Sequence, residues 1–182
     1  MAMTDKQIPT LNADDSQNAA RPLAETLRPA RLEDVVGQPQ VTGLSPAQLQ
    51  NGSYILWGPP GTGKTTVARI LGHESEQVFV SISAVFDGVA DLRRIFKEAE
   101  GRFAAGQTTL LFVDEIHRFN KAQQDALLPA IESGLVRLVG ATTENASFAL
   151  NAALLSWAQI LVLSPLDEAA LHVLLSLSLI HI

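Results

Sequence analysis

A glycine-rich octapeptide is the feature of the sequence that most clearly points to chemistry. It reads GPPGTGKT from Gly58 to Thr65 and fits the pattern G-x-x-x-x-G-K-[ST] at every fixed position. Glycines let backbone N–H groups converge on a phosphate where a Cβ would obstruct it. Lys64 would bring a positive charge to the β- and γ-phosphates, and the Thr65 hydroxyl would ligate Mg²⁺. The predicted phosphate-binding residues are Gly58, Pro59, Pro60, Gly61, Thr62, Gly63, Lys64, Thr65 and Thr66. The alternative is an ordinary glycine-rich turn between a strand and a helix.

Two adjacent carboxylates, Asp114 and Glu115, follow the apolar segment Leu110–Val113. A buried strand that ends in two carboxylates is costly unless they bind something. In a protein with a phosphate-binding loop, Asp114 would hold Mg²⁺, directly or through water. Glu115 would then polarise an attacking water as general base. An acidic cap on the next helix is the simpler alternative, but the complete phosphate loop earlier in the chain favours the catalytic interpretation.

Apolar segments alternate with helical ones around both motifs. Runs of apolar residues predict strands at Tyr54–Trp57, Val78–Ile82, Leu110–Val113, Leu135–Gly140 and Ile160–Leu163. Helical spacing predicts helices at Thr65–Gly72, Asp91–Phe103 and Ala122–Ile131, the last with a kink at Pro129. This alternation predicts an α/β fold, a parallel sheet with helices on both faces. A core domain over residues 21–175 is expected, which starts with a connector (21–38) and follows a disordered tail (1–20).

Composition narrows the functional classes. The 182 residues are 47% hydrophobic and 18% charged, which suits one sizeable core and excludes general disorder. The absence of Cys excludes a disulfide scaffold, a thiol nucleophile and a cysteine zinc site, and fits a reducing cytoplasm. A formal charge of −6 argues against a globally basic nucleic-acid binder, although a local basic patch remains compatible with it. No continuous apolar run is long enough to predict a transmembrane helix.

Longer motifs resemble a known family. The phosphate loop, the DEIH at Asp114–His117 and the GATTEN at Gly140–Asn145 resemble AAA+ ATPases of the clamp-loader and Holliday-junction-helicase group. The stretches Arg118–Pro129 (RFNKAQQDALLP) and Thr142–Asn151 (TTENASFALN) are more specifically similar to the replication-associated recombination protein A family. The resemblance extends from about residue 21 to about residue 174, with Ala146 in place of the family's usual Pro.

This resemblance implies an oligomeric, cytoplasmic, DNA-stimulated ATPase that uses ATP and Mg²⁺ at stalled or gapped replication forks. Replication proteins such as single-stranded-DNA-binding protein would be its partners. The resemblance gives the Walker roles to Lys64, Thr65, Asp114 and Glu115. It makes Thr143 the sensor of the γ-phosphate, with Asn145 as the fallback, and places Val36, Gly37 and Gln38 near the adenine. A plain turn hydroxyl is the alternative for Thr143. His117 and Arg118 are expected at a helix start and on the surface.

The chain departs from the family at two places. Where the family motif ends Leu-Leu-Ser-Arg, with an Arg finger that reaches the neighbouring subunit's nucleotide, this chain has Trp157. Trp cannot stabilise developing phosphate charge, so the alternative source of a finger is Arg137. The family also continues past Leu174 into a helical lid and an oligomerisation region. Here residues 177–182 read LSLIHI, the translation of a common sequencing adapter, so we predict a non-native tail over 176–182, a missing lid and a monomeric chain. A genuine amphipathic segment is the alternative.

Two other functions remain open at this stage. A Holliday-junction branch-migration ATPase would share the DEIHR and GATT motifs. A clamp-loader-like subunit that binds nucleotide with little turnover would suit the missing finger. The predicted DNA contacts are basic side chains on one helix, Arg93, Arg94 and Lys97, and near the turn after the acidic strand, Arg118 and Lys121. For each of them, a merely solvated charge is the alternative.

Overall fold

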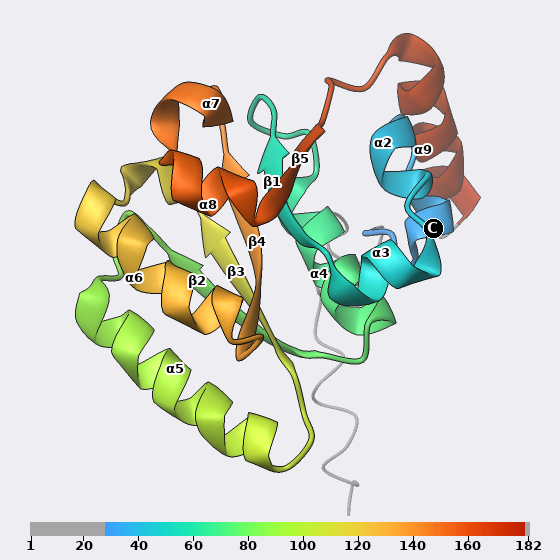
Figure 1. Cartoon of the computed structure of the whole chain (residues 1–182). Helices are drawn as coiled ribbons and strands as arrows, with labels where there is room; N and C mark the ends of the chain where they lie inside the picture. The colour runs from blue at the N-terminus through green and yellow to red at the C-terminus, as the bar shows by residue number, and fades with distance from the viewer. Residues whose placement is uncertain (1–27, 181–182) are drawn as a thin grey trace, which may run out of the picture.

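Five parallel strands form one sheet at the centre of the computed structural model, which describes residues 28–180 (Figure 1). The tail predicted over residues 1–20 therefore lies outside the described residues. In chain order the strands are β1 (Ser53–Trp57), β2 (Val78–Ser83), β3 (Thr109–Asp114), β4 (Val136–Thr142) and β5 (Ala158–Val162). Each corresponds to a predicted strand, and the parallel α/β fold class is confirmed.

The order of the strands in the sheet is β2-β3-β4-β1-β5. The central strand β4 pairs with β3 on one side and β1 on the other, in a register that sets Val139 opposite both Phe112 and Tyr54. All strands run in the same direction, so their carboxyl ends share one edge. In open α/β sheets, ligands bind beyond this edge. The three segments that follow β1, β3 and β4 are therefore neighbours in space although they are far apart in sequence.

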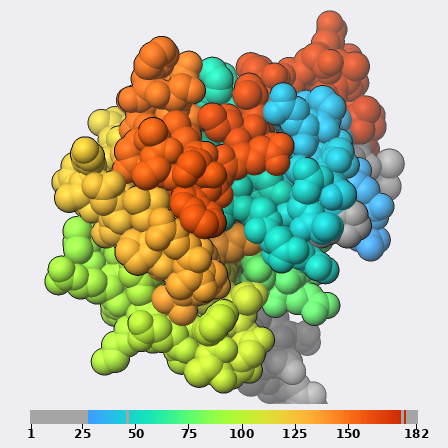
Figure 2. Space-filling view, viewed as in Figure 1, coloured from blue at the N-terminus to red at the C-terminus, as the bar shows by residue number. Residues whose placement is uncertain are grey.

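Helices cover both faces of the sheet because alternate strand residues point to opposite sides. On one face, Ile55, Leu111 and Leu138 pack with apolar residues of α5 (Val89–Ala104), α6 (Lys121–Glu132), α7 (Ala146–Ala149) and α8 (Ala152–Ser156). On the other, Leu56 and Phe112 pack with residues of α4 (Lys64–Glu74), α2 (Pro39–Thr42) and the 3₁₀ turn η2 (Leu32–Asp34). The space-filling view shows atoms of α5, α6 and α8 lying in front of the strands (Figure 2).

The three predicted helices are confirmed as α4, α5 and α6, and α6 continues through Pro129 to Glu132. The sequence analysis did not resolve α2, α3 (Pro46–Asn51), α7 or α8, each of which is shorter than two turns. Such helices begin at side-chain caps rather than at a long apolar pattern: the side chains of Ser45, Asn145 and Asn151 accept hydrogen bonds from backbone N–H groups of α3, α7 and α8, respectively.

A further helix, α9 (Glu168–Ile180), follows β5, and its residue Ala170 lies next to Gly37, shortly before α2 (Figure 1). It includes residues 176–180, which the sequence analysis assigned to a non-native tail, whereas residues 181–182 lie outside the described residues. No helix in the described part of the chain is long and apolar enough to cross a membrane.

Candidate nucleotide site

The glycine-rich loop lies between β1 and α4, at the carboxyl edge of the sheet. Gly61 and Gly63 adopt positive φ angles of 80° and 89°, a conformation that favours glycine. A Cβ at either position would have no atom within 4 Å, so the space in front of the loop is open. Gly58 meets the opposite condition, because a Cβ there would collide with the carbonyl oxygen of Leu163. The loop is thus tied to β5 at its start and open along its middle.

The N-terminus of α4 faces this open space. Gly63 is its N-cap and provides no side-chain hydrogen bond, and the first turn carries no acidic residue. The first N–H groups of the helix therefore remain available to an anion, which the helix dipole also favours. Thr65 lies in the first turn, and the Thr62 hydroxyl donates to the Pro59 carbonyl at 2.9 Å, which holds the loop closed on itself.

Lys64 is buried, with 8% of its surface exposed, and its ammonium sits within the loop. Its Nζ donates to the carbonyl oxygens of Gly58 at 2.7 Å and Pro59 at 2.8 Å. Burial lowers the pKa of Lys64 from its ordinary value, and the negative charges of Glu115 and Asp114 oppose that shift. The loop cation and the two carboxylates therefore belong to one site.

A cavity of about 180 Å³ adjoins the loop. Gly61, Gly63 and Thr66 form its polar side. Its apolar side consists of Pro29, Val35, Val36, Val67, Leu166 and Leu174, with Thr62 and Gln38 completing the wall. Val36 thus lines the apolar side of the cavity, whereas Gly37, which was predicted beside it, lies against Leu166 and Ala170.

The side of this cavity supplied by Leu166 and Leu174 was not predicted. Leu166 precedes α9 and Leu174 belongs to it, and the sequence analysis did not predict that helix. Gln38, which the resemblance places near the adenine, is buried and joins the two walls: its amide donates to the Ser164 carbonyl at 2.8 Å and accepts from the Ser164 N–H at 3.1 Å.

Asp114 and Glu115 lie at the end of β3, beside the loop. Glu115 has φ 52° and ψ 42°, a left-handed conformation that non-glycine residues adopt at a cost. Its N–H donates to Asp114 Oδ1 at 3.1 Å. This turn redirects the chain after β3, so that η3 (Ile116–Arg118) starts at once and the Glu115 side chain is held next to the end of β4.

Thr143 and Asn145 follow β4, but the structure uses them differently. The Thr143 hydroxyl donates to Glu115 Oε2 at 3.5 Å, so it belongs to the carboxylate cluster. The Asn145 side chain instead accepts a hydrogen bond from the Ser147 N–H at 3.0 Å and caps α7. Of the two residues predicted to sense a phosphate, the structure brings Thr143 to Glu115 and gives Asn145 a local structural contact.

The prediction that His117 lies on the surface is wrong. Its side chain is 3% exposed and lies between Glu115 and Glu144, whereas Arg118, the other residue expected there, is exposed. A polar run such as DEIHR carries no sequence signal for this burial. It arises because the end of β4 passes next to η3, so that Thr142 lies within hydrogen-bond distance of the ring.

The departure at Trp157 lies at the opposite edge of the sheet. Trp157 is half-exposed and directly precedes β5, whose first residue pairs with the first residue of β1. A strand of five residues spans roughly 16 Å, so residue 157 cannot reach the phosphate loop of its own chain. Arg137, the alternative source of a finger, is buried and occupied: it donates to the Gly52 carbonyl and stacks over the Tyr54 ring at 5.5 Å. The expectation for Arg137 is therefore not supported.

The basic side chains considered for DNA contact differ in their surroundings. Arg93, Lys97 and Lys121 are exposed, as is Arg118. Arg94 is also exposed but pairs with Asp91 at 3.5 Å and Glu98 at 3.7 Å along α5. Such surface pairs leave the charge of Arg94 accessible to solvent.

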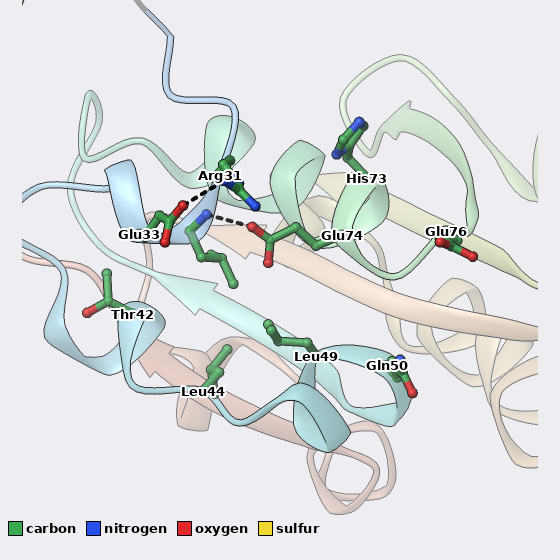
Figure 3. Close-up of a pocket in the computed structure, with 10 residues that line it drawn as sticks. Arg31, Glu33, Thr42, Leu44, Leu49, Gln50, His73, Glu74 and Glu76 are labelled. Atoms are coloured by element: carbon green, nitrogen blue, oxygen red, sulfur yellow. Dashed lines mark hydrogen bonds and ion pairs between the residues drawn. The ribbon is translucent and has the colours of Figure 1, made fainter.

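A cavity of about 570 Å³ opens elsewhere, between η2, α3 and the end of α4 (Figure 3). The Leu32 N–H donates to Glu74 at 2.8 Å and an Arg31–Glu33 ion pair of 2.9 Å crosses its rim. Its walls include Thr42, Leu44, Leu49, Gln50, His73 and Glu76. Neither the glycine loop nor Asp114 and Glu115 line this cavity, so it is separate from the nucleotide site.

Comparison with known proteins agrees with this geometry. Residues 54–166, more than half of the chain, match the profile of the ATPase family associated with various cellular activities (AAA). Replication-associated recombination protein A of Coxiella burnetii is 49% identical over 162 residues, and that of Escherichia coli 46% over 163. Each match covers 86% of this chain and 36% of the relative. ATPase WRNIP1 of Dictyostelium discoideum is 44% identical over 164 residues, which is 87% of this chain and 19% of the relative. The chain thus spans about a third of the length of its bacterial relatives.

A solved structure shares the fold. The RuvB Holliday junction branch migration motor of Thermotoga maritima superposes with a TM-score of 0.66 at 29% sequence identity. The match covers 86% of this chain and 55% of that one.

Proposed function

Because this chain belongs to the AAA family of ATPases, we propose that it binds ATP with Mg²⁺ at the phosphate loop and hydrolyses the γ-phosphate bond. One observation carries the proposal. The loop after β1, the carboxylates after β3 and the Thr143 hydroxyl after β4 meet at one edge of the sheet, with Lys64 in the field of both carboxylates. Nothing in the packing of the sheet itself calls for these polar groups.

The residues fit the groups that they would hold. The open N-terminus of α4 and the glycine loop suit the phosphates, and the apolar wall beside them suits a base. Mg²⁺, when bound, would neutralise phosphate charge, held by Thr65 and by Asp114 directly or through water.

Lys64, Glu115 and Thr143 then have separate roles in hydrolysis. Lys64 exchanges its loop carbonyls for phosphate oxygens and stabilises their charge. Glu115 orients a water in line with the γ-phosphate and accepts its proton. The Thr143 hydroxyl donates to Glu115 in this structure. It can sense the γ-phosphate by donating to a phosphate oxygen instead.

We further infer that the ATPase acts on DNA as an assembly of several copies, in the cytoplasm. The support is the names of the relatives, which concern replication-associated recombination and Holliday junction branch migration. Partners such as single-stranded-DNA-binding protein remain a prediction from the family resemblance. Fluorescence anisotropy with a forked duplex, a Holliday junction and a single strand, each with and without ATP, tests this inference. Equal, negligible binding to all three would contradict it.

A nucleotide-binding subunit with little turnover is the second candidate, and the half-exposed Trp157 favours it. An uncharged side chain there cannot act on the nucleotide of a neighbouring copy. The two candidates share ATP binding and differ in turnover.

Replacing Thr65 by Val tests the assignment of the binding site. The change removes one metal-ligating oxygen and keeps the shape of the side chain. We expect the gain in ATP affinity on adding Mg²⁺ to fall sharply, while the affinity without Mg²⁺ stays the same. Calorimetric titrations with Mg²⁺ and with a chelator measure both. Thr108→Val, at an exposed threonine that directly precedes β3 at the other edge of the sheet, is the matched control. An unchanged Mg²⁺ effect in Thr65→Val would contradict the assignment.

A further inference from the structure

The buried ring of His117 has no task in the mechanism above, although it contacts the proposed general base. Its Nδ1 lies 3.3 Å from Glu115 Oε2 and 3.1 Å from the Thr142 hydroxyl. Its Nε2 lies 3.4 Å from Glu144 Oε1. The side chain is only 3% exposed, so both ring nitrogens face protein atoms. A buried polar ring of this kind fixes the geometry of whatever it contacts.

The hydrogen bonds of Thr142 determine which group donates. Its hydroxyl accepts from the Glu144 N–H at 3.0 Å and donates its single hydrogen to the Glu144 carbonyl at 3.2 Å. The oxygens nearest to Nδ1 are therefore both acceptors, so we assign the hydrogen to Nδ1. This N–H lies between Thr142 and the Glu115 carboxylate.

Two polar groups thus approach the same oxygen of Glu115. The Thr143 hydroxyl donates to Oε2, and Nδ1 of His117 lies within ion-pair distance of it, at 3.3 Å. No group within residues 28–180 donates a hydrogen bond to the other oxygen, Oε1. An arrangement that occupies one carboxylate oxygen and leaves the other unbonded fixes the orientation of the carboxylate and keeps one oxygen available for a proton.

We propose that His117 is a positioning residue for Glu115, joining the carboxylate to the end of β4 so that Oε1 faces the attacking water. The inference rests on the proposed ATP hydrolysis and adds a residue to it. His117 acts through Glu115 and does not touch the nucleotide. ATP binding depends on Lys64 and the glycine loop, so losing His117 lowers turnover and leaves affinity unchanged.

The expected size follows from the loss of orientation. The Glu115 side chain is one-third exposed, so without His117 it can rotate toward solvent. Misplacing a catalytic group by about 1 Å costs on the order of 10²-fold in rate. We expect His117→Ala to lower kcat by about 10- to 100-fold, with the KM and Kd for ATP within about twofold of the parent.

His117→Asn provides the rescue and His73→Ala the control. The Asn amide nitrogen can occupy the place of Nδ1 and donate toward Glu115, but the shorter side chain does not reach Glu144. This variant should therefore recover most of the lost turnover. His73 is an exposed histidine on α4, and its replacement should change nothing. Single-turnover hydrolysis with enzyme in excess over labelled ATP resolves even slow rates.

A spectroscopic measurement tests the contact without changing His117. The chain has 4 His, whose ring nitrogens can be ¹⁵N-labelled and resolved by NMR. In Glu115→Gln the His117 ring signals, assigned by their absence in His117→Asn, should move, and those of His73 should stay. Unchanged His117 signals would overturn the contact.

The outcomes separate the two proposals. Turnover that falls in both Glu115→Gln and His117→Ala, and recovers in His117→Asn, supports the positioning role. Turnover that falls only in Glu115→Gln overturns the role of His117 and leaves the ATPase proposal standing. Turnover unaffected in Glu115→Gln overturns the general-base role of Glu115 and with it the positioning role, whereas no turnover in the parent chain overturns the hydrolysis proposal itself.

Discussion

Lys64→Ala should weaken ATP binding more than any other single substitution in the loop. Lys64 is 8% exposed, and its ammonium donates two short hydrogen bonds, at 2.7 and 2.8 Å, to the Gly58 and Pro59 carbonyls. When ATP binds, these bonds are exchanged for stronger ones to charged phosphate oxygens. Bonds to charged groups contribute about 1.5–3 kcal/mol each, and part of this compensates for the lost carbonyls. A net loss of about 2–4 kcal/mol follows.

That loss corresponds to a Kd for ATP raised by about 30- to 1000-fold, since each 1.4 kcal/mol is a factor of about ten. Isothermal titration with Mg²⁺ present measures the Kd, and thermal unfolding without nucleotide establishes that the variant is folded. Lys97→Ala removes an exposed lysine from α5 and is the matched control. If the Lys64→Ala chain is folded and its Kd stays within twofold of the parent value, the phosphate-loop assignment is refuted.

Three further predictions concern Gly58, Arg137 and Trp157. Gly58→Ala forces a Cβ against the Leu163 carbonyl, so the free energy of unfolding in urea should fall by about 1–3 kcal/mol, and an unchanged value would contradict the close approach. Arg137→Met removes the buried cation over Tyr54, which should lower stability by a similar amount and leave ATP affinity unchanged; weakened ATP binding would show that Arg137 serves the site. Trp157→Arg should not change turnover in dilute solution, where copies do not meet, because residue 157 cannot reach its own loop. A rise independent of chain concentration would contradict this.

The strands and the phosphate loop could be predicted because their signals are local. The apolar run Leu110–Val113 is long enough to identify a buried strand, and GPPGTGKT specifies the turn that follows another. The observed end of a strand differs from the predicted one where pairing with a neighbouring strand extends it. β4 begins at Val136 and continues to Thr142, beyond the predicted Gly140, because Thr142 pairs with Trp57 of β1.

The parts that could not be predicted depend on contacts between distant segments. Whether Thr143 or Asn145 approaches Glu115 is decided by how the chain turns after β4, and the cap on α7 engages Asn145. His117 looks like a surface residue in the sequence and is buried only because Thr142 lies against it. The apolar cavity wall comes partly from Leu174 of α9, a helix that the sequence analysis did not anticipate.

Measuring ATP affinity and ATP turnover separately, on one preparation of the parent chain and of Glu115→Gln, tests the central claim most directly. Gln keeps the shape of the side chain but cannot accept the proton of the attacking water. The proposed site predicts an equal Kd for ATP with Mg²⁺ in both chains, together with single-turnover hydrolysis that is measurable in the parent and abolished in Glu115→Gln. Hydrolysis at the parent rate in Glu115→Gln would show that Glu115 is only a structural element of the turn after β3. Absence of ATP binding by the folded parent chain would contradict the nucleotide site itself.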